Sequence, residues 1–208
     1  DVALHADGTD LTIGRISAQG NVTLSANRNI IDGDAGADTG TVDIEAGGLT
    51  IGVAALDDIH NVGAVANPLE TRVAILRVED SRLSAGAAAT TGLYIANEGD
   101  LEVEYGTNIG TAGQIDTFSL STSGALTVSG GLNMVGDDAD VIALTSTGGD
   151  LSVSAGGSAM ATAGAGTITL TSSDDLHLDS DVVTSNAGTV NLSAGAAITD
   201  DGDVDSEI

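Results

Sequence analysis

The chain has 208 residues and a formal net charge of −26, because 31 acidic residues face five arginines and no lysine. Such a charge repels nucleic acid and anionic membranes, so we expect neither nucleic-acid binding nor membrane insertion. The sequence has no cysteine, which excludes disulfides and thiolate metal sites, and it has no apolar run long enough for a membrane-spanning helix. Three aromatic residues and 29 glycines indicate a thin aliphatic core with many tight turns.

Short segments in which apolar and polar residues alternate follow one another along the chain, a pattern typical of half-buried strands. Their apolar pairs form a first series: Val2/Leu4, Val22/Leu24, Val42/Ile44, Val73/Ile75, Leu93/Ile95, Phe118/Leu120, Ile142/Leu144, Ile168/Leu170 and Val190/Leu192. A second series trails the first by about eight residues: Leu11/Ile13, Ile30, Leu49/Ile51, Leu83, Leu101/Val103, Leu126/Val128, Leu151/Val153, Leu176/Leu178 and Ile198. A weaker third series consists of Ile109, Leu132/Met134, Met160 and Val182/Val183.

Two or three short strands per coil, in coils of 20–26 residues repeated about nine times, predict a solenoid. We therefore expect an all-β fold, a right-handed parallel β-helix that forms a single domain over residues 1–208. Each strand would pair with its counterpart one coil away, and the inward side chains would stack into apolar ladders. An immunoglobulin-like sandwich fits less well, because it needs a bulky buried aromatic residue and has no 25-residue period.

One step of the first series is longer than the others. From Val42 to Val73 it spans 31 residues, and the extra residues predict a loop insertion at about 53–72. Loops that leave a regular scaffold often carry function, so positively charged and imidazole side chains in and after this loop form a candidate binding patch: His60, Arg72, Arg77 and Arg82. The alternative is a tolerated insertion whose arginines pair with nearby acids.

Acidic residues cluster at several predicted turns, and calcium binds six to eight oxygens that such turns often supply. Two clusters contain the candidate calcium ligands: Asp32, Asp34 and Asp38, and Asp137, Asp138 and Asp140. They lie about four coils apart, so they cannot share one ion. Their spacing matches neither the EF-hand loop, which needs a glycine where Ala37 lies, nor the calcium β-roll repeat. Solvated acidic turns without a metal are the alternative interpretation, and we expect no other cofactor.

No catalytic constellation is recognisable. Glycan-cleaving β-helix enzymes need a basic residue or paired carboxylates, with aromatic side chains to hold the sugar. Lysine is absent, and the three histidines, His5, His60 and His177, are far apart in the coil order. We therefore expect that the protein is not an enzyme, and we keep a glycan-active enzyme or a carbohydrate-binding module as the alternative function.

Four repeats resemble those of filamentous-haemagglutinin-type bacterial adhesins: GNVTLSA at 20–26, GALTVSG at 124–130, GDLSVSA at 149–155 and GTVNLSA at 188–194. The resemblance covers most of the chain outside residues 53–72. It implies a secreted, extracellular rod with a right-handed β-helix, and a structural or adhesive role in a large microbial surface or fibre protein. Its implied partners are glycans or proteins on a host or neighbouring cell.

The two ends of a solenoid expose unpaired backbone groups. No polar capping helix is recognisable at either end of this sequence. We therefore expect end-to-end self-association, or continuation of the solenoid in a longer chain.

Overall fold

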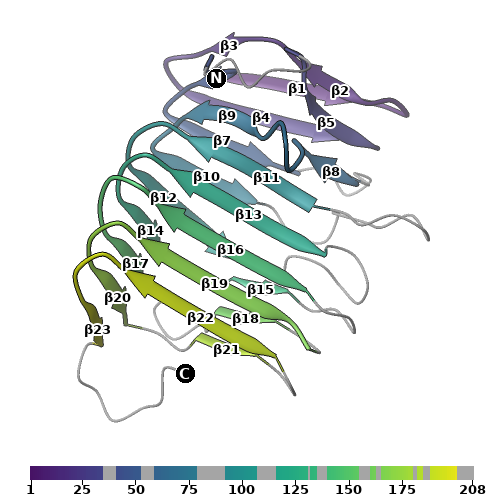
Figure 1. Ribbon diagram of the computed structural model, residues 1–208. Coiled ribbons are helices and arrows are strands. Elements are labelled where there is room, and N and C mark those ends of the chain that lie inside the picture. Colours follow the sequence, from purple (N-terminus) through teal and green to yellow (C-terminus); the bar gives the residue numbers. More distant parts are fainter. Residues whose placement is uncertain are drawn as a thin grey trace.

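The computed structural model describes residues 1–34, 41–52, 59–78, 92–106, 116–130, 132–134, 140–154, 160–162, 165–179, 182–184 and 188–200. In this part of the chain there are strands and turns but no helix, and strands of successive coils stack in parallel (Figure 1). The architecture is an all-β parallel solenoid, which confirms the predicted fold class. No helix long and apolar enough to cross a membrane occurs among these residues.

The first sheet takes one strand from each coil and has nine strands. In spatial order they are β1 (Val2–Ala6), β4 (Asn21–Ala26), β7 (Gly48–Ile51), β10 (Ile75–Val78), β12 (Leu101–Gly106), β14 (Leu126–Val128), β17 (Leu151–Val153), β20 (Leu176–Leu178) and β23 (Ile198–Asp200).

The second sheet has eleven strands and two parts. Its main path is β2 (Leu11–Ile13), β5 (Asn29–Asp32), β8 (Asn61–Val62), β11 (Gly92–Asn97), β13 (Thr117–Thr122), β16 (Val141–Ser146), β19 (Thr167–Ser172) and β22 (Thr189–Ala194). A side path joins β11 and consists of β3 (Ile16–Ser17), β6 (Ile44–Glu45) and β9 (Leu69–Arg72). A third, short sheet consists of β15 (Asn133–Met134), β18 (Met160–Thr162) and β21 (Val182–Thr184), which contain residues of the weak third series.

The pairing register corrects the predicted alignment in the middle of the chain. Val22 pairs with Leu49, and Leu49 pairs with Leu76, each 27 residues further on. The prediction that Val42 and then Val73 follow Val22 in one series is therefore wrong. The 31-residue step between those two valines does not join stacked residues, and the longest coils of the first sheet exceed the predicted 26 residues by one.

The region predicted as a loop insertion contributes two strands, β8 and β9, to the second sheet. Strand β11 pairs with β8 through Gly92 and Leu93, and with β9 through its last three residues. Residues 63–68 separate β8 from β9 and leave the sheet in a small excursion, closed by the antiparallel bridge between Ala64 and Asn67. Residues 53–58 lie outside the described part of the chain.

The core consists of apolar ladders from the inward faces of the sheets. Inward residues two apart on one strand stack on the same pair in the next coil, as Phe118 and Leu120 stack on Ile142 and Leu144. These four side chains are buried. Each buried aliphatic side chain contributes roughly 1.5–3 kcal/mol relative to an exposed one, so the ladders drive folding although the core has few aromatic residues.

A second inward ladder is polar and lies where the second sheet turns into the first. Its buried members lie at or next to the ends of successive strands: Thr71, Asn97, Thr122, Ser146 and Ser172. Ser146 Oγ lies 2.7 Å from the carbonyl oxygens of Gly124 and Gly149, and its one proton is shared between them. These side chains satisfy turn carbonyls that would otherwise be buried without a donor.

Carboxylates before the strands of the first sheet form a further ladder. Asp100 Oδ1 accepts the N–H of Ala125 at 2.9 Å, and Asp150 Oδ1 accepts the N–H of Asp175 at 3.1 Å. Each carboxylate thus caps the backbone of the following coil. Part of the strong acidity of the chain therefore has a structural role at this corner.

Candidate functional site

The structure brings two of the six predicted calcium ligands together with two acids that the sequence did not single out. Asp32 and Asp34 lie with Asp43 and Glu70 in one group, whose ligand oxygens all lie within 4.8 Å of one another. We call these four residues the acid cluster. Asp140, another predicted ligand, is buried and directly precedes β16. In the second sheet, β16 lies three strands beyond β8, so Asp140 is far from the acid cluster. Asp38, Asp137 and Asp138 lie outside the described residues.

The members of the acid cluster come from three segments of adjacent coils. Asp32 ends β5, and Asp34 follows it by two residues. Asp43 directly precedes β6, and Glu70 lies within β9. The side chains of Asp32, Asp43 and Glu70 are buried, and that of Asp34 is partly exposed.

Backbone and amide donors hold two of the carboxylates in place. Asp32 accepts the N–H of Asp34 at 3.1 Å and the side-chain Nδ2 of Asn67 at 2.5 Å. Asp43 Oδ2 accepts the N–H of Glu70 at 3.1 Å. The other oxygen of Asp43, Oδ1, is buried and accepts no hydrogen bond.

Burial disfavours the ionised form of the cluster. Desolvation raises the pKa of Asp43 from 3.8 to about 6, and repulsion from Asp32 and Asp34 adds to this effect, while hydrogen bonds with Glu70 oppose it. Desolvation also raises the pKa of Asp32. A pKa of about 6 instead of 3.8 corresponds to a cost of about 3 kcal/mol for a charged Asp43 carboxylate.

Glycines let the chain leave the sheet beside the cluster. A Cβ on Gly33 would lie 2.5 Å from the carbonyl oxygen of Ile13, so a larger residue does not fit directly after β5. Gly63 directly follows β8 with φ +62°, a left-handed conformation that glycine adopts without strain. The excursion that begins at Gly63 contains Asn67, whose amide contacts Asp32.

Asp43 and Glu70 were missed because they are 27 residues apart and belong to no local acidic run. Their proximity follows from the pairing of Ile44 with Thr71, which places the residues before them opposite each other. A correct alignment of the coils would have predicted that Asp43 and Glu70 are neighbours. The alignment predicted from the sequence was wrong in this region.

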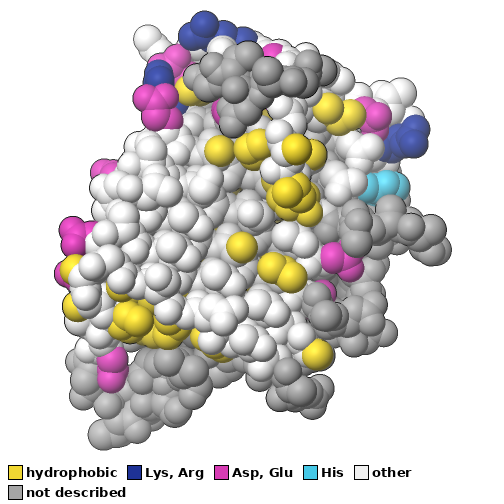
Figure 2. All heavy atoms as spheres, in the orientation of Figure 1, with side chains coloured by type: hydrophobic (Ala, Val, Ile, Leu, Met, Phe, Trp, Pro, Cys, Tyr) yellow, Lys and Arg dark blue, Asp and Glu magenta, His cyan; other side chains and the backbone are white. Residues whose placement is uncertain are grey.

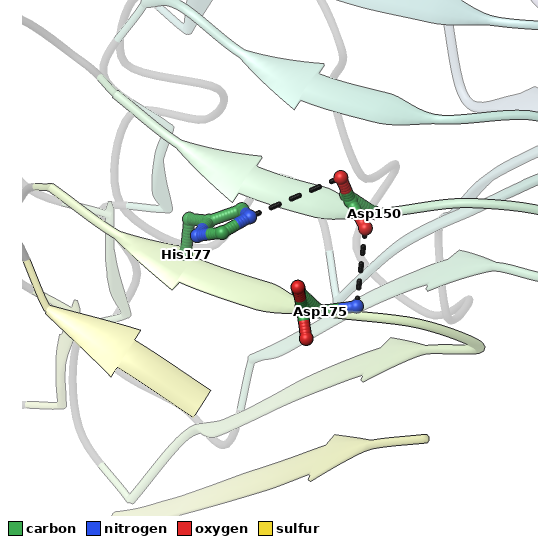
Figure 3. Close-up of side chains that lie close together, drawn as sticks. All are labelled: Asp150, Asp175 and His177. Atoms are coloured by element: carbon green, nitrogen blue, oxygen red, sulfur yellow. Dashed lines mark hydrogen bonds and ion pairs between the residues drawn. The ribbon is translucent and has the colours of Figure 1, made fainter. Parts of the chain in front are cut away.

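A second group of possible metal ligands consists of Asp150, Asp175 and His177 (Figure 3). Here the carboxylates already bind backbone donors of the following coil, and Asp175 Oδ1 accepts the N–H of Ala197 at 2.9 Å. His177 Nδ1 lies 2.6 Å from Thr199 Oγ1. All three side chains are partly exposed, so the capping of successive coils explains this group.

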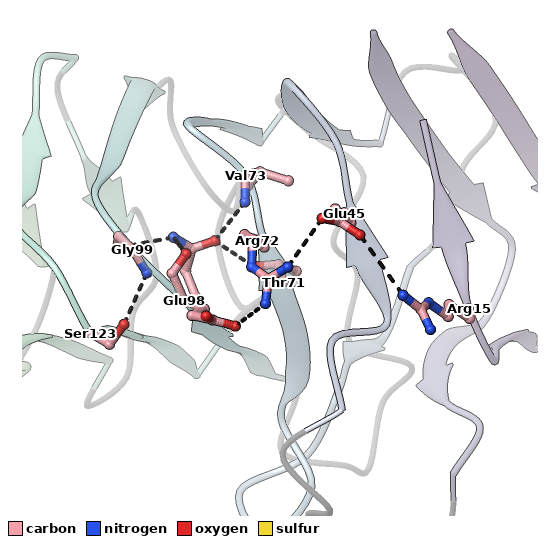
Figure 4. A network of polar contacts seen from close by, with 9 residues as sticks. Arg15, Glu45, Thr71, Arg72, Val73, Glu98, Gly99 and Ser123 are labelled. Carbon is pink, nitrogen blue, oxygen red and sulfur yellow. Dashed lines mark hydrogen bonds and ion pairs between the residues drawn. The ribbon is translucent and has the colours of Figure 1, made fainter. Parts of the chain in front are cut away.

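The predicted binding patch is distributed over two sheets. Arg72 in β9 lies in a line of alternating charges, Arg15, Glu45, Arg72 and Glu98, that crosses successive coils (Figure 4). Its Nη1 lies 3.1 Å from Glu45 and its Nη2 lies 2.5 Å from Glu98, and hydrogen bonds to these two carboxylates raise the pKa of Arg72.

The other members of the patch lie elsewhere. Arg77 in β10 of the first sheet pairs with Glu104 at 2.5 Å. The His60 N–H donates to the carbonyl oxygen of Arg28 at 2.6 Å, directly before β8. Arg82 lies outside the described residues. The arginines that the structure describes therefore hold acids of neighbouring coils.

The outer face of the second sheet is uncharged from β11 to β22. Figure 2 shows this face, on which acidic and basic side chains lie at the margins. Apart from Val141 and Tyr94, its outward positions carry small, hydroxyl or amide side chains, and Tyr94 is the largest. A groove of about 380 Å³ lies beside Tyr94 and is lined by Val65, Pro68 and the hydroxyl residues Thr117, Ser119 and Ser121.

Comparison with protein-family models, with curated proteins and with solved structures gave no match.

Proposed function

We propose that the chain is a structural, rod-forming segment of an extracellular microbial surface or fibre protein. The observation that carries this proposal is the continuous parallel stacking of the first sheet, in which each strand from β1 to β23 pairs with the strand of the next coil. Such a stack has no natural limit to its length, because every coil offers the next one the same backbone edge and the same apolar ladder.

The state of the last described coil supports further stacking. In β22 the inward residues Val190 and Leu192 are only partly buried, and Ile198 in β23 is 51% exposed. The corresponding residues one coil earlier, Ile168, Leu170 and Leu176, are fully buried. A further coil would bury the interior of the last one, whether it came from a longer chain or from a second copy.

Two copies of the chain fused in tandem test this role. We expect one rod of twice the length by electron microscopy and a single cooperative unfolding transition at a higher temperature than for one copy, because neighbour interfaces add stability in solenoids. The untreated single chain, imaged over a range of concentrations, is the control and reports end-to-end association. Two independent transitions at the single-chain temperature, with two separated particles, would contradict the proposal.

The groove beside Tyr94 favours carbohydrate binding as the second candidate function. A partly exposed aromatic ring next to hydroxyl side chains on an uncharged face is chemistry that suits a neutral sugar. A glycan array with the wild-type chain and with Tyr94→Ala tests it, and Thr169→Ala on the same face is the matched control. Binding that is lost only in Tyr94→Ala supports this function, and the absence of binding by the wild-type chain contradicts it.

A further inference from the structure

We propose that the acid cluster of Asp32, Asp34, Asp43 and Glu70 binds one calcium ion that ties two adjacent coils of the solenoid together. This metal site goes beyond the proposed structural role and does not depend on it. The site is built from three segments that the sequence separates by up to 38 residues and the solenoid brings together.

The first argument is geometric. One ligand oxygen from each of the four carboxylates lies within 4.8 Å of the others, which is the arrangement that a single cation bound at 2.3–2.6 Å from each oxygen requires. Like charges at this distance repel, so four converging carboxylates need a compensating interaction.

The second argument is the state of Asp43. Its side chain is 1% exposed, and Oδ1 accepts no hydrogen bond. The neighbouring charges that act on it, Asp32 and Asp34, are negative. A buried carboxylate oxygen without a donor costs free energy unless a proton or a cation neutralises it.

A proton shared with Glu70 is the competing explanation. The carboxyl groups of Asp43 and Glu70 are close enough to hydrogen-bond when one of them is protonated. One shared proton neutralises one of four charges, and three carboxylates then remain in a largely buried group. A divalent cation neutralises two charges and contacts all four carboxylates, so it accounts for the whole cluster.

The donor set selects calcium among the common divalent metals. All ligands are hard oxygens, the chain has no cysteine, and the cluster contains no histidine, so soft and borderline metals have no preferred ligand. Four carboxylates offer up to eight oxygens, which matches the six to eight that calcium takes. Magnesium usually binds one or two carboxylates and keeps several waters.

Calcium at this position would stabilise the part of the solenoid where the chain leaves the second sheet. Asp32 and Asp34 lie at the end of β5, Asp43 directly precedes β6, and Glu70 lies in β9, after the excursion at residues 63–68. One ion would hold β5, β6 and β9 together. We therefore expect calcium to raise the unfolding temperature of the chain.

Calorimetric titration of calcium into the chelator-stripped chain at about pH 7.5 tests the site. We expect one saturable ion per chain, at least tenfold weaker binding in the double variant Asp43→Asn/Glu70→Gln, and at least tenfold weaker binding of magnesium. The matched control is Asp150→Asn/Asp175→Asn, which removes two charges from the other acidic group and should change the affinity less than twofold.

Three results would overturn the proposal: no saturable calcium binding by the folded wild-type chain at about 1 mM calcium, equal affinity in Asp43→Asn/Glu70→Gln, or equal affinity for magnesium. Circular dichroism establishes whether each variant is folded. If the double variant does not fold, Asp34→Asn decides the question, because this partly exposed ligand can be changed without disturbing the core. We expect Asp34→Asn to weaken calcium binding at least threefold, and unchanged affinity in this variant counts against the site.

Discussion

Asp43 and Glu70 lie opposite each other on adjacent coils, joined by one backbone–backbone hydrogen bond and one from a backbone N–H to a side chain. The Glu70 N–H donates to Asp43 Oδ2 at 3.1 Å, and the Asp43 N–H donates to the Glu70 carbonyl oxygen at 2.9 Å. The parallel ladder thus fixes two buried carboxyl groups side by side. The hydrogen bonds between Asp43 and Glu70 therefore stabilise the strand pairing, but they also hold two acidic side chains close together in a buried place. The first two predictions follow from this electrostatic repulsion.

Replacing Asp43 by Asn should stabilise the chain when calcium is absent. The amide oxygen can still accept the Glu70 N–H, and the buried negative charge is removed. We expect the free energy of unfolding at about pH 8 in chelator to rise by about 1–2 kcal/mol, measured by urea denaturation. Asp150→Asn is the control, with an expected change of less than about 0.5 kcal/mol. A loss of stability in Asp43→Asn would contradict the account.

The raised pKa of the Asp43 carboxyl group predicts how the free energy of unfolding depends on pH when calcium is removed by a chelator. The pKa of Asp43 is raised from 3.8 to about 6 in the folded chain, so the folded state binds more protons than the unfolded state between these values. Its contribution to stability is therefore fully present below about pH 4 and is lost as the pH rises through about 6, by about 3 kcal/mol at most.

Urea midpoints of the wild-type chain and Asp43→Asn across this pH range isolate the contribution of Asp43. Asp32, Asp34 and Glu70 are the acidic groups that face it, and they are common to both proteins. The wild-type midpoint should fall relative to the variant as the pH rises. Parallel curves would show that Asp43 titrates normally.

Asn97 should be essential to the polar corner ladder. Its buried Oδ1 accepts from Thr71 Oγ1 at 2.9 Å and from the Val73 N–H at 3.0 Å, and its Nδ2 lies 3.3 Å from the Gly99 carbonyl oxygen. Asn97→Ala leaves these buried groups without a partner, which should cost about 2–4 kcal/mol of unfolding free energy. The exposed Asn191→Ala is the matched control and should cost less than about 0.5 kcal/mol. Equal effects of the two variants would refute this role.

Gly148 should be required for the spacing between coils. A Cβ at this position would lie 2.0 Å from the backbone carbonyl oxygen of Ser123 in the preceding coil, and backbone atoms there cannot give way easily. We expect Gly148→Ala to lower the free energy of unfolding by about 1–3 kcal/mol. A Cβ on Gly14 meets nothing within 4 Å, so Gly14→Ala should be nearly neutral in the same denaturation experiment. Similar stabilities of the two variants would contradict the close approach.

The sequence was sufficient to predict the fold class, because alternation and coil repetition are local patterns. From Phe118 onward the two sheets can be told apart: Phe118 to Leu126 is a short step, and Leu126 to Ile142 is a long one. In the first coil the steps from Leu4 to Ile13 and from Ile13 to Leu24 are similar in length. The apolar pattern is the same on both sheets, so nothing local showed that Leu49 continues the sheet of Val22.

The same ambiguity limited the prediction of the candidate site. Asp32 and Asp34 were recognised because they are close in the sequence, whereas Asp43 and Glu70 meet only through the register of β6 and β9. The polar ladder at Asn97 and Thr122 was also missed, since inward polar residues interrupt the alternation that marks a strand. Both features depend on contacts one coil away.

A crystal structure of the chain grown with calcium, with anomalous differences measured at long wavelength or after terbium exchange, tests the central claim most directly, because it reports coil register and metal position together. The account predicts a solenoid in which Leu49 stacks between Val22 and Leu76, with one anomalous peak in the acid cluster. A different register at these residues would contradict the fold. Correct register with no peak in the acid cluster, or with the only peak at Asp150, Asp175 and His177, would contradict the metal site.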